Sequence, residues 1–312
     1  MKNFKHLNSW ALSLALLSLP LFSTTASGAD EVEEVVAVGS RREARSVGDS
    51  PAPVDIITGS DFVNQGAMDL PDMIRTLVPS FNVNTQPISD AATLIRPANL
   101  RGLPPDNMLV LVNGKRRHRG AVISFLGSGI SDGAQGPDIS AIPSIALKQV
   151  EVLRDGASAQ YGSDAIAGIL NFVLRDDQDG TQLEIRSGQY KEGDGDAWRI
   201  AANIGMPFTS SGFANFSVEL QDSKATSRSV QRADAQGLYD GGNTAIWNYP
   251  EPAQIWGSPD VSDDYKFVVN LGLSLDESKD FYLFGNYGER NVLGGFFFRN
   301  PTNRGGVFST DG

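Results

Sequence analysis

Apolar and polar residues alternate along the second half of the chain, and this pattern limits what the chain folds into. Glu184 separates Leu183 from Ile185, and from Tyr265 to Leu275 every second residue is apolar or aromatic. Such alternation predicts β-strands with one apolar and one polar face. Strands of a transmembrane β-barrel alternate in this way because one face meets lipid and the other meets the lumen. A secreted antiparallel sandwich with one wet face gives the same pattern, so the alternation alone leaves both folds open.

The first 29 residues have the layout of a secretory signal peptide. Lys2 and Lys5 precede an apolar run from Trp10 to Phe22, and small residues follow it. The run is too short for a membrane-anchor helix, and no other stretch reaches the roughly 18 apolar residues that a spanning helix needs. Any membrane insertion therefore uses strands. Secretion together with the lack of cysteine favours the barrel, in a bacterium with two membranes.

Composition excludes several classes of function. The 312 residues include 26 Lys and Arg against 37 Asp and Glu, and the formal net charge of -11 disfavours nucleic-acid binding. The absence of cysteine rules out disulfides and thiolate metal sites, and His6 and His118 are the only histidines. No serine–histidine arrangement suggests acyl transfer, so we expect neither an enzyme nor a cofactor. The basic run Lys115–Arg119 indicates a solvated face rather than a phosphate site.

Between the signal peptide and the alternating strands the pattern is mixed. Asp69 is placed to cap a helix that runs to Leu77, with Pro71 in its first turn. Asn113-Gly114, which follows an apolar strand, is a strong hairpin signal. Strands are also expected at residues 53–57, 108–112, 149–153 and 169–174, and a helical turn at 143–147. Short strands and short helices without βαβ spacing predict a small α+β domain.

The order of these segments resembles that of a TonB-dependent outer-membrane receptor. Glu33–Val38 is similar to a TonB box, and the segment from Asp69 to Phe81 is similar to the first helix of the plug domain and its exit. The segment from Leu100 to Lys115 resembles the central plug strands. The most specific resemblance lies between Ile142 and Asn171, and the whole match extends over about residues 31–175.

The resemblance implies a fold class and a division of the chain. We expect an α+β plug domain followed by antiparallel transmembrane β-barrel strands, with the barrel incomplete. The expected division is a signal peptide at 1–29, a flexible leader with the TonB box at 30–48, a plug domain at 49–178 and the N-terminal part of the barrel at 179–312. The last segment supplies about five or six strands, whereas the smallest barrels need about eight, so we interpret the chain as the N-terminal part of a longer receptor.

The resemblance also implies partners and site residues. TonB, of the inner-membrane TonB–ExbB–ExbD complex, would bind the TonB box, which consists of Glu33, Glu34, Val35, Val36, Ala37 and Val38. Strand addition suits this segment because backbone hydrogen bonds then carry the pull. Arg101 and Arg154 would latch the plug domain to barrel glutamates, or be ordinary surface charges.

The remaining expectations concern ligand and location. The resemblance implies a small extracellular ligand of the siderophore-iron, cobalamin or glycan class, with ligand-binding residues that the sequence does not identify. It implies contact with outer-membrane lipid, no nucleic acid, no metal site and no covalent chemistry. The expected location is the outer membrane of a Gram-negative bacterium.

Two other classes of function stay open at this point. A TonB-linked signalling transducer would carry an additional N-terminal domain, whereas only about twenty residues separate the expected cleavage site from the plug domain. A secreted β-rich binding or adhesion protein would lack the barrel, and heat-modifiable migration on gels separates it from a barrel protein.

Overall fold

The computed structural model describes residues 53–85, 92–124, 129–243, 257–276, 278–295 and 300, together with two short strands at 35–36 and 45–46. These residues belong to one compact unit, residues 34–312. The predicted signal peptide and most of the leader lie outside the described residues. No helix in the described part of the chain is long and apolar enough to cross a membrane.

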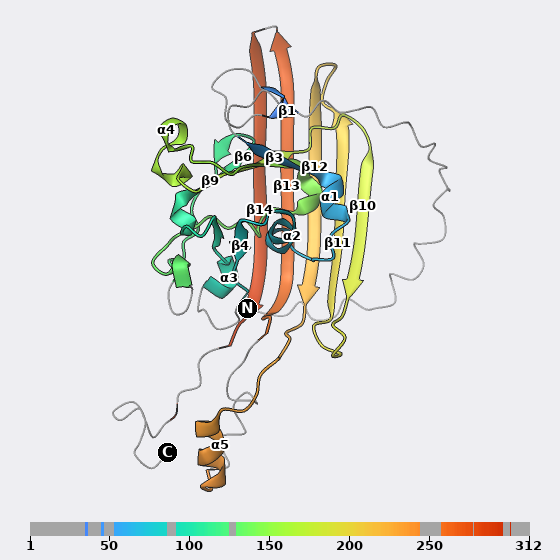
Figure 1. Ribbon diagram of the computed structural model, residues 1–312. Coiled ribbons are helices and arrows are strands. Elements are labelled where there is room, and N and C mark those ends of the chain that lie inside the picture. The colour runs from blue at the N-terminus through green and yellow to red at the C-terminus, as the bar shows by residue number, and fades with distance from the viewer. Residues whose placement is uncertain are drawn as a thin grey trace, which may run out of the picture. The chain divides into compact units, whose positions relative to one another are not determined.

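The plug domain is built on a mixed sheet with the strand order β3, β8, β9, β6, β7 (Figure 1). β6 and β9 run parallel, and the other neighbours in this sheet run antiparallel. A second, two-stranded sheet pairs β4 with β5. The strand bounds are β3 Val54–Thr58, β4 Phe81–Val83, β5 Ala98–Leu100, β6 Met108–Val112, β7 Lys115–Arg116, β8 Leu147–Leu153 and β9 Gly168–Leu174. The predicted strands are therefore present, with small shifts at their ends.

The helices of the chain are short. They are α1 Gly59–Val63, α2 Leu70–Leu77, α3 Ala92–Ile95, α4 Ser158–Tyr161 and α5 Ala233–Asp240, with 3-10 turns at η2 Pro105–Asn107, η3 Gly129–Ser131, η4 Ser144–Ala146 and η5 Ser163–Ala165. α2 begins as predicted, because the Asp69 side chain accepts a hydrogen bond of 3.1 Å from the Asp72 N–H. Asn113 and Gly114 have φ values of 47° and 72°, as the predicted hairpin turn between β6 and β7 requires.

A second sheet, which we call the wall, consists of β10 to β14 in chain order, and all its neighbouring strands are antiparallel. Its bounds are β10 Thr181–Gly188, β11 Ala197–Pro207, β12 Gly212–Ser223, β13 Asp260–Asp276 and β14 Lys279–Leu293. The connections 208–211 and 277–278 are short, whereas 189–196 and 224–259 are long, and the described residues of the long connections lie at the lower end of the wall in Figure 1. Among the described residues β10 and β14 have one strand neighbour each, so the barrel is not closed.

The two faces of the wall differ as the alternation predicts. Leu183 and Ile185 are 65% and 69% exposed on one face, whereas Arg199 is fully buried on the other. The exposed face also carries Trp198, Ile200, Val218, Leu220, Tyr265, Phe267, Phe281, Leu283 and Tyr287. The buried face carries Asn203, Asn215, Ser217, Glu219, Gln221, Asp264, Lys266 and Asn270. The predicted fold class is therefore confirmed: an α+β plug domain is followed by antiparallel strands of an incomplete barrel.

The polar face of the wall lies against the plug domain and completes its core at two points. Met73 and Ile74 of α2 and Phe172 of β9 are fully buried in the plug core. Val268 of β13 belongs to the same core, and Phe284 of β14 packs against it. The wall therefore buries part of the apolar surface that stabilises the plug domain.

Gly168 is the point where β9 enters the sheet beside β8. Its φ is 137°, and a Cβ atom here would lie 2.3 Å from the Leu153 carbonyl oxygen and 2.8 Å from Leu100 Cδ2. Only glycine fits this approach, because any side chain would collide with backbone that cannot move aside.

Candidate functional site between the plug domain and the wall

A cavity of about 300 Å³ lies between the plug domain and the wall. The plug domain lines it with Asp69 and Asp72, at the start of α2, and with Arg96. The wall lines it with Asp264 and Arg290. The long connections contribute Tyr190, Gly195, Lys224, Thr226 and Ser258. The cavity therefore lies at the end of the wall that carries the long connections.

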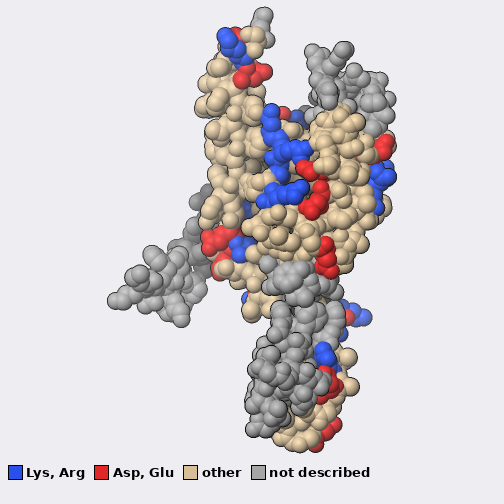
Figure 2. All heavy atoms as spheres, turned by 90° about the vertical axis from the view of Figure 1, so that its left-hand side faces the viewer, with Lys and Arg blue, Asp and Glu red and all other residues tan. Residues whose placement is uncertain are grey.

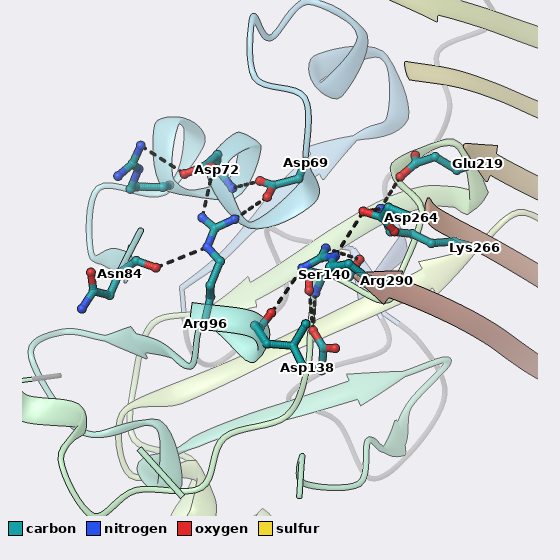
Figure 3. Close-up of polar contacts among 12 residues, drawn as sticks. Asp69, Asp72, Asn84, Arg96, Asp138, Ser140, Glu219, Asp264, Lys266 and Arg290 are labelled. Atoms are coloured by element: carbon teal, nitrogen blue, oxygen red, sulfur yellow. Dashed lines mark hydrogen bonds and ion pairs between the residues drawn. The ribbon is translucent and has the colours of Figure 1, made fainter. Parts of the chain in front are cut away.

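One charged cluster on the plug side of the cavity centres on Arg96 (Figure 3). Its guanidinium donates to Asp69 Oδ2 and, over 3.0 Å, to Asp72 Oδ2, and its Nε donates to the Asn84 carbonyl over 3.2 Å. Arg96 follows α3 in the left-handed backbone region, with φ at 53°. The side chain of Arg96 is only 10% exposed, so this one guanidinium ties the start of α2 to the segments that flank β4 and β5.

The two aspartates of this cluster titrate differently. Burial raises the pKa of Asp69, but the Arg96 guanidinium and hydrogen bonds from Asp72 outweigh burial and hold that pKa well below its ordinary value. Burial raises the pKa of Asp72 as well, and the negative charge of Asp69 adds to this, so the pKa of Asp72 is about 6. Because the two carboxyl groups share one guanidinium, Asp69 stays ionised and Asp72 binds a proton below about pH 6.

Replacing Asp72 with asparagine is expected to remove a pH dependence of plug stability. The pKa of Asp72 rises from 3.8 to about 6 on folding, so between these values the folded state holds a proton that the unfolded state has released. The free energy of unfolding therefore falls as the pH rises from about 4 to about 6, by at most ~3 kcal/mol from this group. The lowered pKa of Asp69 changes the free energy of unfolding in a different pH range. The stability that it contributes is lost only as the pH falls below about 4.

The measurement is the urea concentration at which the plug domain of the intact protein opens, at about pH 4.5 and 7. A cysteine introduced at Ala98, which is buried in β5, reports opening through labelling with a thiol reagent that reacts at both pH values, and the parent protein without this cysteine gives the background labelling. The exposed Asp155 offers a matched control, and Asp155→Asn should keep the pH dependence of the parent. Equal pH dependence in Asp72→Asn and the parent would contradict the prediction.

A second charged cluster lies on the polar face of the wall (Figure 3). Lys266 Nζ is 2.6 Å from Glu219 Oε1 and 3.4 Å from Asp264 Oδ2, and Arg290 Nε is 3.2 Å from the same Asp264 oxygen. In Figure 3 Arg290 points from the wall toward Ser140 of the plug domain. These charges are almost fully buried, so each depends on its partners to offset the loss of water.

The two predicted latch arginines do not reach the wall in the described part of the chain. Arg154 Nε lies 2.6 Å from Asp55 Oδ2, within the plug domain, and both side chains are about two-fifths exposed. Arg101 is exposed and has a left-handed backbone with φ at 55°, and its N–H donates to the Ser80 carbonyl. A latch to later barrel glutamates stays a prediction for both residues.

The structure instead joins wall and plug through residues that sequence reasoning did not select. Arg186, Arg199 and Arg290 lie on β10, β11 and β14, and each donates hydrogen bonds to the plug domain. The available signal was that all three are arginines on the polar face of alternating strands. Their partners are distant in sequence, so the pattern of the strands alone does not identify them.

Part of the predicted TonB box is described as a strand. β1 Val35–Val36 pairs antiparallel with β2 Arg45–Ser46, with Val35 opposite Ser46. Glu33, Glu34, Ala37 and Val38 lie outside the described residues. The backbone of Val35 and Val36, within the predicted TonB box, therefore takes part in strand pairing here, and contact of this segment with TonB stays a prediction.

Within the basic run Lys115–Arg119, Arg116 and Arg119 lie largely in solvent and pair with acidic groups, whereas Arg117 donates to the Asn286 side chain of the wall. Arg116 and Arg119 lie 2.6 and 3.5 Å from Asp164, and both side chains are about half exposed. Figure 2 faces the side of the molecule where α4 and β6 lie, and there Lys and Arg gather with Asp and Glu beside them. This arrangement supports the interpretation as a solvated face. The described residues hold no cluster of His, Cys, Asp or Glu that suits a metal ion.

Comparison with known proteins identifies the part of the chain that holds the mixed sheet. Residues 46–169 match the family model of the TonB-dependent Receptor Plug Domain. The chain therefore contains a TonB-dependent receptor plug domain. This match includes the charged cluster around Arg96 and most of the mixed sheet, whereas the wall lies C-terminal to it.

Relatives of this chain include two curated proteins of Vibrio cholerae. The vitamin B12 transporter BtuB is 31% identical over 180 residues, which are 57% of this chain and 27% of the relative. An iron-regulated outer membrane virulence protein is 31% identical over 172 residues, which are 54% of this chain and 24% of the relative. The chain thus spans about a quarter of the length of the curated relatives it matches. They agree with the predicted location in the outer membrane of a Gram-negative bacterium.

Solved structures of siderophore receptors share the fold. A variant of the ferric enterobactin receptor PfeA of Pseudomonas aeruginosa, in complex with enterobactin, aligns with a TM-score of 0.57 at 20% identity, over 77% of this chain and 33% of that one. The siderophore receptor PirA of Acinetobacter baumannii aligns with a TM-score of 0.57 at 19% identity, over 81% and 34%. These likenesses extend through both the plug domain and the wall.

Proposed function

We propose that this receptor is an energised importer of a scarce extracellular ligand. In outer-membrane barrels, short turns face the periplasm and long loops face the outside. By this rule the connections 208–211 and 277–278 face the periplasm, and the cavity at the opposite end faces the medium. The position of this cavity, between the plug domain and the long connections, is the observation that carries the proposal. The exposed apolar face of the wall is proposed to contact lipid.

The energy for import is proposed to come from TonB. The leader precedes β3 directly, so a pull on the leader acts on an outer strand of the plug sheet. The backbone of Val35 and Val36 is already extended and paired with β2, which supports its use as an added strand. TonB, within the inner-membrane TonB–ExbB–ExbD complex, would then displace or reshape the plug domain without any covalent step.

The ligand is proposed to be of the siderophore-iron, cobalamin or glycan class. Two relatives bear the names of a vitamin B12 transporter and an iron-regulated outer membrane protein, and PfeA was solved with enterobactin. The cavity offers acidic, basic and hydroxyl groups side by side, from Asp72, Arg96, Lys224 and Thr226. Such a lining suits a polar ligand with several hydrogen-bonding groups.

The test is uptake by cells whose own cobalamin and siderophore receptors are deleted. Labelled cobalamin and a labelled ferric catecholate are supplied to cells that produce this receptor, with and without TonB. We expect one ligand to bind in both strains and to accumulate only with TonB. Accumulation that is equal in the two strains would contradict the role of TonB. Binding that changes gene expression without accumulation would instead identify a signalling transducer.

A further inference from the structure

No ion pair between described residues crosses the boundary between the plug domain and the wall. Every ion pair joins two groups of the plug domain, or two groups of the wall and its connections. In the described part of the chain none crosses from residues 53–178 to residues 179–300. Direct ion pairs of the described residues therefore lie within each part, although buried charges line the interface and the charge of Arg290 also acts on Asp69 of the plug domain.

The strongest contact across this boundary is made by Arg186 of β10. Its Nη2 donates to the carbonyl oxygens of Phe62 and Val63, at 3.1 and 2.9 Å, and its Nη1 donates to those of Gln65 and Ala67. These carbonyls belong to the end of α1 and the segment that follows it. Carbonyls at a helix end lack partners within the helix, so one guanidinium from the wall satisfies several of them at once.

Two further arginines of the wall make the same kind of contact. Arg199 Nη2 lies 2.6 Å from the Ser144 hydroxyl of η4. Arg290 donates to the carbonyl oxygens of Leu94 and Ser140, at 3.3 and 3.5 Å. In all three cases the plug domain offers only neutral acceptors. The side chains of Arg186, Arg199 and Arg290 are 14%, 0% and 12% exposed.

The carboxylates that balance these arginines are held by the wall. Glu184 pairs with both Arg186 and Arg199, and Asp264 pairs with Arg290. Other hydrogen bonds that cross the boundary join neutral groups, such as Asn113 with Asn270, or join Arg117 of the plug domain with the Asn286 amide. If the plug domain moves, each wall arginine keeps its carboxylate, and water replaces the lost acceptor. A crossing ion pair would instead leave a buried charge without its partner.

We propose that Arg186, Arg199 and Arg290 form a release clamp, which holds the closed plug domain by hydrogen bonds to neutral acceptors, so that each of these three guanidiniums keeps its wall carboxylate when the plug domain leaves. The clamp fixes the plug domain in position through the planar fork of each guanidinium, and the charge of the clamp stays with the wall. This inference rests on the proposed function, because it gives the clamp a purpose only if TonB moves the plug domain.

The test measures how fast the plug domain opens in the full receptor at a fixed urea concentration. A cysteine at Ala98 reports opening by thiol labelling, and heat-modifiable migration confirms that each variant is assembled. Arg186→Lys keeps the charge beside Glu184 but lacks the fork that reaches several carbonyls. Arg228→Lys is the matched control, since Arg228 pairs with Glu192 and Asp194 and gives no described hydrogen bond to the plug domain. We expect roughly tenfold faster labelling in Arg186→Lys, equivalent to 1.4 kcal/mol, and no change in Arg228→Lys.

Two substitutions of Ser144 distinguish the loss of a clamp contact from a general destabilisation of the interface. Ser144→Ala removes the neutral acceptor of Arg199, and labelling should become several-fold faster. Ser144→Asp places a carboxylate of the plug domain beside Arg199 and so creates a crossing ion pair of a kind that the described residues do not contain. Labelling should then slow by about tenfold, and uptake that depends on TonB should fall. A damaged interface would open faster, so slower opening is specific to the clamp.

The outcomes of these experiments test the release clamp separately from the proposed import function. Equal labelling rates in Arg186→Lys and Arg228→Lys, or faster opening in an assembled Ser144→Asp receptor, would overturn the clamp. Labelling in urea needs neither TonB nor ligand, so it tests the clamp even if no uptake is found. The expected labelling rates without uptake in any strain would reject import of the two ligands supplied and leave the clamp standing.

Discussion

Replacing Val36 with proline is expected to reduce uptake to the level of cells without TonB, while Val36→Ala leaves most of the uptake intact. A segment that TonB captures by strand addition is held through its backbone, so the side chain matters less than the N–H. Proline removes that N–H and disfavours the central positions of a strand pair, so the added strand loses a ladder hydrogen bond that alanine keeps. β1 places Val36 inside such a pair in this structure, opposite Arg45.

The measurement compares ligand binding at the cell surface with accumulation inside the cell. Val36→Pro should bind ligand as well as the parent, because no described residue of the leader lines the cavity. Arg45→Pro, in the partner strand β2, is the matched control for a loss of the β1–β2 pair alone. If Val36→Ala and Val36→Pro reduce uptake equally, then side chains rather than backbone govern the contact, and strand addition is the wrong mode.

Local signals in the sequence were enough to predict most elements of the plug domain. Asp69, Pro71 and the apolar face of the following turns specify α2, because capping and periodicity act within a few residues. The turn at Asn113-Gly114 is specified in the same way. The strands of the wall were predicted from alternation, since lipid and lumen impose the same two-residue period on every strand.

Local sequence signals did not predict the contacts between segments that are distant in sequence. The parallel pairing of β6 with β9 depends on how the chain crosses the sheet, and no local pattern sets it. Arg96 was not selected because its partners Asp69 and Asp72 are remote in sequence. The arginines expected to tie the plug domain to the barrel, Arg101 and Arg154, came from resemblance, whereas the contacts observed come from arginines on the opposite side of the interface. An arginine on the plug domain and an arginine on the wall are both compatible with the alternation pattern. Only the packing of the two parts shows which arginines make a contact.

The largest loss of stability is expected on replacing Arg199 with methionine. Arg199 is fully buried, and its guanidinium lies 2.7 Å from Glu219 Oε2 and 2.9 Å from Glu184 Oε1. Methionine fills a similar length of space but leaves both carboxylates short of a counter-charge. Breaking a buried pair from one side costs about 3–5 kcal/mol, because the remaining charge has lost both its water and its partner. The expected loss lies in this range, reduced to the extent that Lys266 continues to balance Glu219.

Urea unfolding of the receptor in detergent, followed by heat-modifiable migration, measures this loss. Arg232→Met removes an arginine whose pair with Asp234 is one-third exposed, and it should lower the free energy of unfolding by less than about 1 kcal/mol. The double variant Arg199→Met with Glu219→Gln removes a charge of each sign and should recover a substantial part of the loss, since the neutral glutamine needs no counter-ion. If Arg199→Met is no more harmful than Arg232→Met, then water reaches the Glu184–Arg199–Glu219 cluster, and the polar face of the wall is wetter than its contacts with the plug domain imply.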